Sequence, residues 1–75
     1  MPDQIIRLLY PPNLLDVPII NQLIRRFDLT FNILRAEVNL EQGWVDLQLT
    51  GSSGAIESAI TWLSGQGIEV QRLAQ

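Results

Sequence analysis

The 75-residue sequence contains neither cysteine nor histidine. Without cysteine the chain can form no disulfide, iron–sulfur cluster or thiol nucleophile. Without histidine it lacks the usual general base near pH 7 and the commonest metal ligand. The eight acidic residues are scattered singly along the chain. We therefore expect a protein that is not an enzyme and that holds no metal or other cofactor.

The sequence also lacks long apolar runs and an excess of positive charge. No apolar run approaches the ~20 residues that a membrane-spanning helix needs, and no basic segment precedes an apolar stretch at the N-terminus as in a secretory signal. The net charge of −3 disfavours binding to nucleic acid. We expect no membrane insertion, no nucleic acid partner and a cytoplasmic location.

Apolar residues make up 47 % of the chain, a fraction typical of a globular protein, and the length allows a single domain over residues 1–75. Residues 4–10 read as a strand that ends at two prolines. Asp16 and Pro18 form a helix-start pattern, with the acid expected to accept hydrogen bonds from the first turn. The helix should end near Asp28. Its apolar stripe is expected to comprise Val17, Ile20, Leu23, Ile24 and Phe27.

Residues 29–40 form a second predicted strand in which the even positions from Leu34 to Leu40 are apolar and suit a buried face. A turn over 41–43 and an alternating strand over 44–50 follow. Ser52 or Ser53 should cap the second helix, which Gly65 and Gly67 should end. The expected buried stripe of that helix comprises Ile56, Ala59, Ile60 and Leu63, with Trp62 on its flank. Residues 68–72 read as the last strand.

This order of elements predicts an α+β, ferredoxin-like βαββαβ fold. Right-handed crossovers place both helices on one face of a four-stranded antiparallel sheet with strand order 4-1-3-2. The second strand is then an edge, which we expect to pair with a second copy of the chain in a homodimer. The uncovered face is predicted to carry Ile5, Arg7, Leu9, Phe31, Ile33 and Trp44.

The sequence resembles the NIL domain, which is named for an Asn-Ile-Leu motif and occurs at the C-terminus of the ATPase subunits of methionine-import ABC transporters. The resemblance spans nearly the whole chain. Its residues are Tyr10, Asp16 and Pro18, Arg26 and Phe27, the motif Asn32-Ile33-Leu34, Ala36, and the closing segments 60–63 and 67–70.

The resemblance implies an ACT-like module that pairs with a second copy and binds methionine near the pairing surface. The motif asparagine belongs to the ligand site in that family, and Asn32 takes that place here. Its amide offers two donors and one acceptor, and Phe31, Ile33 and Leu34 could wall an apolar side chain. We thus expect a stand-alone regulatory module that binds methionine or a similar small amino acid and acts on a separate protein partner.

Two alternatives stay open at this point. Strand parity predicts that Asn32 lies on the helix-covered side, where its amide could bond the backbone of residues 28–30 and serve only the fold. The domain could instead be a ligand-free interaction or dimerisation module, whose surface would comprise Phe31, Ile33, Trp44 and Leu9.

Overall fold

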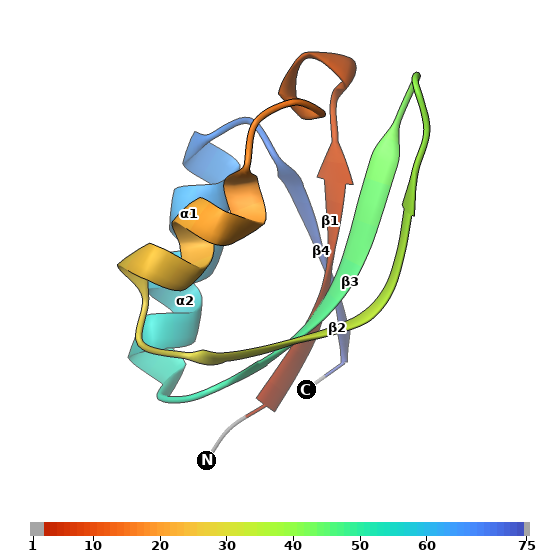
Figure 1. The fold of residues 1–75 in the computed structure, drawn as a ribbon. Coiled ribbons are helices and arrows are strands. Elements are labelled where there is room, and N and C mark those ends of the chain that lie inside the picture. Colours follow the sequence, from red (N-terminus) through yellow and green to blue (C-terminus); the bar gives the residue numbers. More distant parts are fainter. Residues whose placement is uncertain (1–2, 75) are drawn as a thin grey trace.

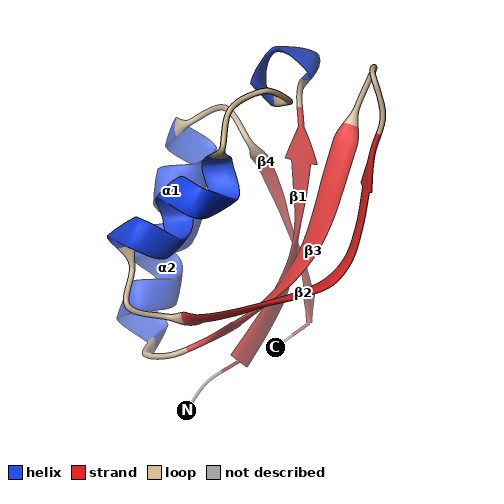
Figure 2. Ribbon diagram, viewed as in Figure 1, coloured by secondary structure: helices blue, strands red, loops and turns tan. Residues whose placement is uncertain are grey.

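The computed structural model describes residues 3–74 and confirms the predicted order of elements. Its elements are β1 (Asp3–Tyr10), a 3-10 turn η1 (Pro12–Leu14), α1 (Ile19–Arg26), β2 (Thr30–Val38), β3 (Gly43–Thr50), α2 (Ser53–Gly65) and β4 (Glu69–Ala74). All strand pairs are antiparallel, and the sheet order is β2-β3-β1-β4, the predicted order read from the other edge. Both helices cover the same face of the sheet, and the other face is open (Figures 1 and 2).

The core lies between the two central strands and the helices, because β1 and β3 alternate apolar residues toward the helix side. Ile6 and Leu8 on β1 pair with Leu47 and Val45 on β3, and all four are buried. Their neighbours Ile5, Arg7, Leu9 and Trp44 therefore point to the open face, as predicted.

The second helix follows the sequence prediction closely. The hydroxyl of Ser52 accepts a hydrogen bond from the backbone N–H of Ala55 at 3.2 Å and caps the helix. The four residues of the predicted stripe are buried. Gly67, with φ of 94°, makes the left-handed turn that follows the helix, whereas Gly65 still lies within it.

The first helix starts later and differently from the prediction. Pro18 is the N-cap residue of α1, and no side chain caps the helix, so the predicted capping role of Asp16 is wrong. Asp16 lies instead in a turn in which the N–H of Val17 donates to the carbonyl of Leu14. The helix begins at Ile19 and buries Ile19 and Leu23. Of the predicted stripe, Leu23 is buried and Val17, Ile20 and Phe27 pack against the core, whereas Ile24 stays exposed.

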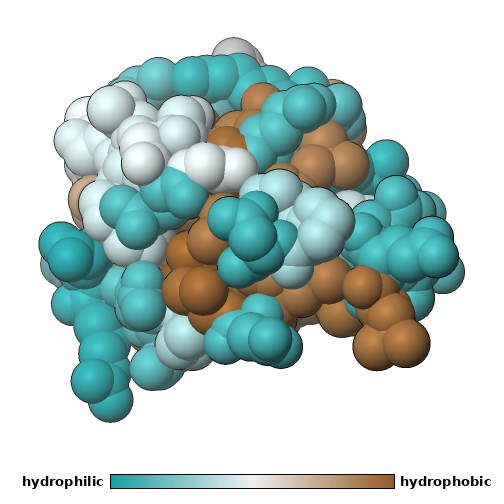
Figure 3. All heavy atoms as spheres, turned by 90° about the horizontal axis from the view of Figure 1, so that it is seen from above, coloured by the Kyte–Doolittle hydropathy of each residue, from teal (hydrophilic) through white to brown (hydrophobic). Residues whose placement is uncertain are grey.

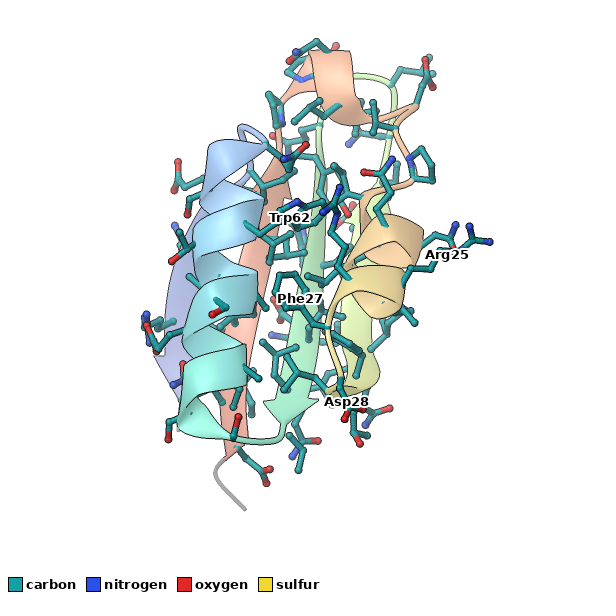
Figure 4. All side chains as sticks on the ribbon, turned by 90° about the vertical axis from the view of Figure 1, so that its left-hand side faces the viewer. Arg25, Phe27, Asp28 and Trp62 are labelled. Carbon is teal, nitrogen blue, oxygen red and sulfur yellow. The ribbon has the colours of Figure 1, made fainter. Side chains whose placement is uncertain are left out.

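The two helices are bridged by aromatic side chains. Phe27, which follows α1, meets Trp62 of α2 edge to face, with ring centroids 6.2 Å apart. The guanidinium of Arg26 lies 5.1 Å from the Trp62 ring. Figure 4 shows Phe27 and Trp62 in the furrow between the helices, with Arg25 pointing away from it. The flanking position predicted for Trp62 is confirmed.

The parity predicted for the second strand is wrong in its first half, because β2 contains a bulge. Asn32 pairs with Gln48 and Ile33 with Leu47, but the next paired residue, Arg35, meets Asp46, so that Leu34 is the extra residue. An extra residue reverses which positions face each side and bends the strand, and β2 bends near its middle in Figure 1. Before the bulge the odd positions face the helices, and after it the even positions do. The burial predicted for the even positions is wrong, because Val38 and Leu40 are exposed and the strand ends at Val38.

Candidate functional site

The motif Asn32-Ile33-Leu34 lies at this bulge, on an edge strand of the sheet. Asn32 shares its side of the sheet with Gln48, which alternates with the buried Leu47 and Leu49. Asn32 is therefore on the open face and exposed, and the predicted helix-covered position is wrong. None of the side-chain hydrogen bonds within residues 3–74 involves Asn32. The local bond to the backbone of residues 28–30 is thus not made.

The apolar neighbours of Asn32 divide between the core and the solvent. Phe31 and Ile33 pair with Leu49 and Leu47, so both face the helix side and not the open face that the sequence predicted. Phe31 packs against the core, whereas Ile33 keeps 57 % of its surface exposed and Leu34 keeps 42 %. The bulge thus presents an unpaired amide and two exposed aliphatic side chains within three consecutive residues.

None of three well-formed hollows in the described structure is lined by the motif residues. One hollow lies beside the end of β1 and the β2–β3 turn, and two others adjoin Leu15 and Val38 between the start of α1 and the far end of β2. The motif therefore occupies an open edge with no opposing wall in the single chain.

The centre of the open face carries a charged cluster that the sequence did not reveal. Arg7 donates to both carboxylate oxygens of Asp46, from Nε at 2.7 Å and from Nη2 at 3.0 Å. Arg35 donates to Oδ2 of the same carboxylate from Nη2 at 3.2 Å. Asp46 is only 2 % exposed although it lies on the uncovered side of the sheet.

Electrostatics and stacking explain why Asp46 can be buried there. The Arg7 guanidinium, through its hydrogen bonds, holds the pKa of the Asp46 carboxyl below its usual range; burial opposes this, and Arg35 reinforces it. The Trp44 ring makes cation–π contacts with both arginines. The guanidinium carbon of Arg7 lies 4.5 Å from the ring centroid, and that of Arg35 lies 5.8 Å from it. A carboxylate held ionised between two arginines is a poor proton donor.

The four residues predicted as one interaction surface do not share a face. Leu9 and Trp44 pair with each other on the open face, whereas Phe31 and Ile33 face the helix side. One sequence signal could have indicated the bulge: the apolar residues stand at odd positions up to Ile33 and at even positions from Ala36 onward.

Two further features can be reported for the described part of the chain. Residues 3–74 contain no group of three or more acidic side chains placed to hold a metal ion. No helix among them is long and apolar enough to cross a bilayer.

The fold and its exposed bulge define a small ferredoxin-like domain with an unpaired edge strand. The family model for the NIL domain matches residues 4–72, and the chain belongs to the NIL domain family.

Curated relatives support this membership. The chain is 34 % identical over 74 residues to the methionine import ATP-binding protein MetN of Burkholderia thailandensis, and 32 % identical to MetN 1 of Paraburkholderia xenovorans. Each match covers 93 % of this chain and 22 % of the relative, so the chain spans about a fifth of the length of these relatives.

A solved structure shares the fold. The C-terminal domain of an ABC transporter ATP-binding protein from Enterococcus faecalis superposes with a TM-score of 0.79 at 23 % identity. The match covers 93 % of this chain and 82 % of that domain. This likeness confirms the ferredoxin-like arrangement.

Proposed function

We propose that this domain is a regulatory module that pairs with a second copy through β2 and binds methionine or a similar small amino acid beside Asn32. The observation that carries the proposal is the exposed bulge on the sheet edge, where the Asn32 amide faces the open side without a partner, and Leu34 at the bulge and Ile33 on the helix side are both exposed. In this proposal the domain binds and does not catalyse, and it works in the cytoplasm, where ATP-binding relatives would meet their nucleotide.

The exposed edge supports the pairing. An edge strand presents unpaired N–H and C=O groups, and proteins usually protect such edges with charges, prolines or a covering element. β2 carries Arg35, Glu37 and the bulge at Leu34, but it has no proline and pairs on one side only, and its large exposed aliphatic residues are Ile33, Leu34 and Val38. A second β2 strand would satisfy the backbone groups and cover these side chains.

The chemistry of the motif supports an amino-acid ligand. The ammonium and the carboxylate of an amino acid must both keep hydrogen bonds when they leave water. The Asn32 amide can serve either group, and Arg35 occupies the next row of the same face with its side chain 67 % exposed. Leu34 at the bulge offers apolar contact for a thioether or alkyl chain, and Ile33 exposes apolar surface on the helix side of the same edge. The partner strand would supply the missing wall of such a site.

The names of the relatives support methionine as the first ligand to test, because the matched proteins are called methionine import ATP-binding proteins. The second candidate function is a ligand-free dimerisation or interaction module acting on a separate protein. The position of the three well-formed hollows, all away from the motif, favours that candidate.

The test is a thermal-shift screen over the amino acids, followed by titration of the best ligand into ¹⁵N-labelled protein. A ligand at a hundred times its dissociation constant should stabilise the domain by about 2.7 kcal/mol. The side-chain amide signals of Asn32 should shift, and Asn32→Ala should abolish the response. Asn21→Ala, which removes an exposed amide from α1, is the matched control and should retain it. If no amino acid moves the Asn32 signals at millimolar concentration, the ligand-free module is the better description.

A further inference from the structure

A hollow of about 430 Å³ lies on the molecule at the end where β1 stops, the β2–β3 hairpin turns and β4 begins. We call it the end hollow. Its lining residues are Leu9, Tyr10, Pro11, Pro12, Glu41, Gln42, Gly43, Trp44, Gly67 and Glu69. This volume lies within the range of about 300–1,000 Å³ typical of small-molecule sites. Figure 3, which views this end of the molecule, shows apolar residues bordered by hydrophilic ones.

The charges at the end hollow are all negative. Glu41 comes from the hairpin turn, and Glu69 is the first residue of β4. The two residues come from different sides of β1, because β1 lies between β3 and β4 in the sheet. Neither belongs to an ion pair among residues 3–74, and no arginine lines the hollow. Glu69 accepts a hydrogen bond from the Gln71 amide but pairs with no cation within the described residues, so a ligand with a positive charge at each end would complement both glutamates.

The floor between the two carboxylates is apolar and aromatic. Trp44 and Leu9 face each other across β3 and β1 on the open face. Trp44 contacts Arg7 and Arg35, which come from the row of Asp46 nearer the middle of the sheet and do not line the hollow. Trp44 is only partly buried and lines the hollow, and methylene groups or an ammonium pack well on such a ring.

From this arrangement we propose that the end hollow binds a small aliphatic diamine. The two ammonium groups would pair with Glu41 and Glu69, and the methylene chain would lie over Leu9 and Trp44. The site is separate from the motif, because Trp44 lies four residues along β3 from Gln48, the partner of Asn32, or about 13 Å. It therefore does not depend on amino-acid binding at Asn32.

The experiment titrates 1,5-diaminopentane into ¹⁵N-labelled full-length chain and follows the indole N–H signals. The chain has two tryptophans, so the Trp62→Phe variant assigns both signals. The Trp44 signal should shift saturably, together with the backbone amides of Gln42 and Gly43, and the Trp62 signal should stay in place. The dissociation constant should rise with salt, since the contacts are charged and exposed.

Matched ligands and variants separate this proposal from non-specific binding. Pentylamine, with one charge, should bind more weakly, and the dianion glutarate should not shift Trp44. Glu41→Gln and Glu69→Gln should each weaken diamine binding about two- to fivefold. Asp28→Asn, the same charge change at the end of α1 away from the hollow, should leave it unchanged (Figure 4). The proposal is overturned if Trp44 shows no saturable shift at 10 mM diamine (about ten-thousandfold above a micromolar dissociation constant). It is also overturned if both glutamine variants bind the diamine as tightly as the parent chain. Methionine binding is read at Asn32, so either proposal can fail without the other.

Discussion

The pairing of β2 with a second copy predicts a large and specific effect of the substitution Ile33→Glu. Ile33 is still 57 % exposed in the single chain, and complete burial of an isoleucine contributes about 1.5–3 kcal/mol. About 1–2 kcal/mol per copy is thus still available from covering it. A symmetric pair uses the residue twice, so the substitution should cost the dimer about 2–3 kcal/mol. That loss raises the dissociation constant about 30- to 150-fold, before any cost of burying the new carboxylate.

Sedimentation equilibrium over a range of protein concentrations measures this constant directly. Leu73→Glu is the matched control, because Leu73 is 45 % exposed on β4, the opposite edge of the sheet. It makes the same chemical change outside the proposed interface and should leave the constant within about twofold, the scatter of a neutral surface substitution. Circular dichroism should show that both variants keep the fold. The reasoning is wrong if Ile33→Glu and Leu73→Glu weaken association equally. It is also wrong if the parent chain is a monomer at 1 mM, because an association energy of about 4 kcal/mol is enough to show pairing at that concentration.

Three further predictions concern the fold. Arg7 and Arg35 lower the pKa of Asp46, so the ion pair should stabilise the fold above the usual carboxyl pKa and lose that contribution as pH falls through the lowered value. The difference in urea unfolding free energy between the parent and Asp46→Asn should therefore shrink toward pH 2; a difference independent of pH would contradict this. Ser52→Ala should cost about 1 kcal/mol by removing the α2 cap, whereas Ser53→Ala should cost less than half of that by the same assay. Equal losses would exclude the capping role. Gly67→Ala should cost about 1–2 kcal/mol because its φ is 94°, and Gly65→Ala, in open space within the helix, should be neutral or stabilising. The account of the turn fails if both alanine variants unfold at the same urea concentration.

The sequence predicted the fold well where one period dominates. β3 alternates without interruption, and α2 has four apolar residues at helical spacing between a serine cap and a glycine. Such patterns depend only on neighbouring residues, so they can be read without knowing the tertiary structure. The start of α1 was harder to predict, because Asp16 and Pro18 also suit the turn that the chain makes there.

The candidate site was harder to predict than the fold because it depends on contacts between distant residues. One bulge at Leu34 moved Asn32 to the open face and Ile33 to the helix side. Asp46 alternates with buried leucines and therefore looked exposed, yet Arg7 and Arg35 from two other strands and the ring of Trp44 cover it. The end hollow likewise joins Glu41 and Glu69, which no local pattern connects.

Hydrogen exchange of the β2 backbone amides is the most direct measurement of the central claim, that this edge receives a second copy of the chain. In a lone chain the outward N–H groups of β2 have no partner and should exchange rapidly with solvent. β4 is the other edge of the same sheet and provides an internal reference. The account predicts that protection of the outward β2 amides rises with protein concentration while that of β4 stays constant. Rapid exchange at both edges at every concentration would contradict it.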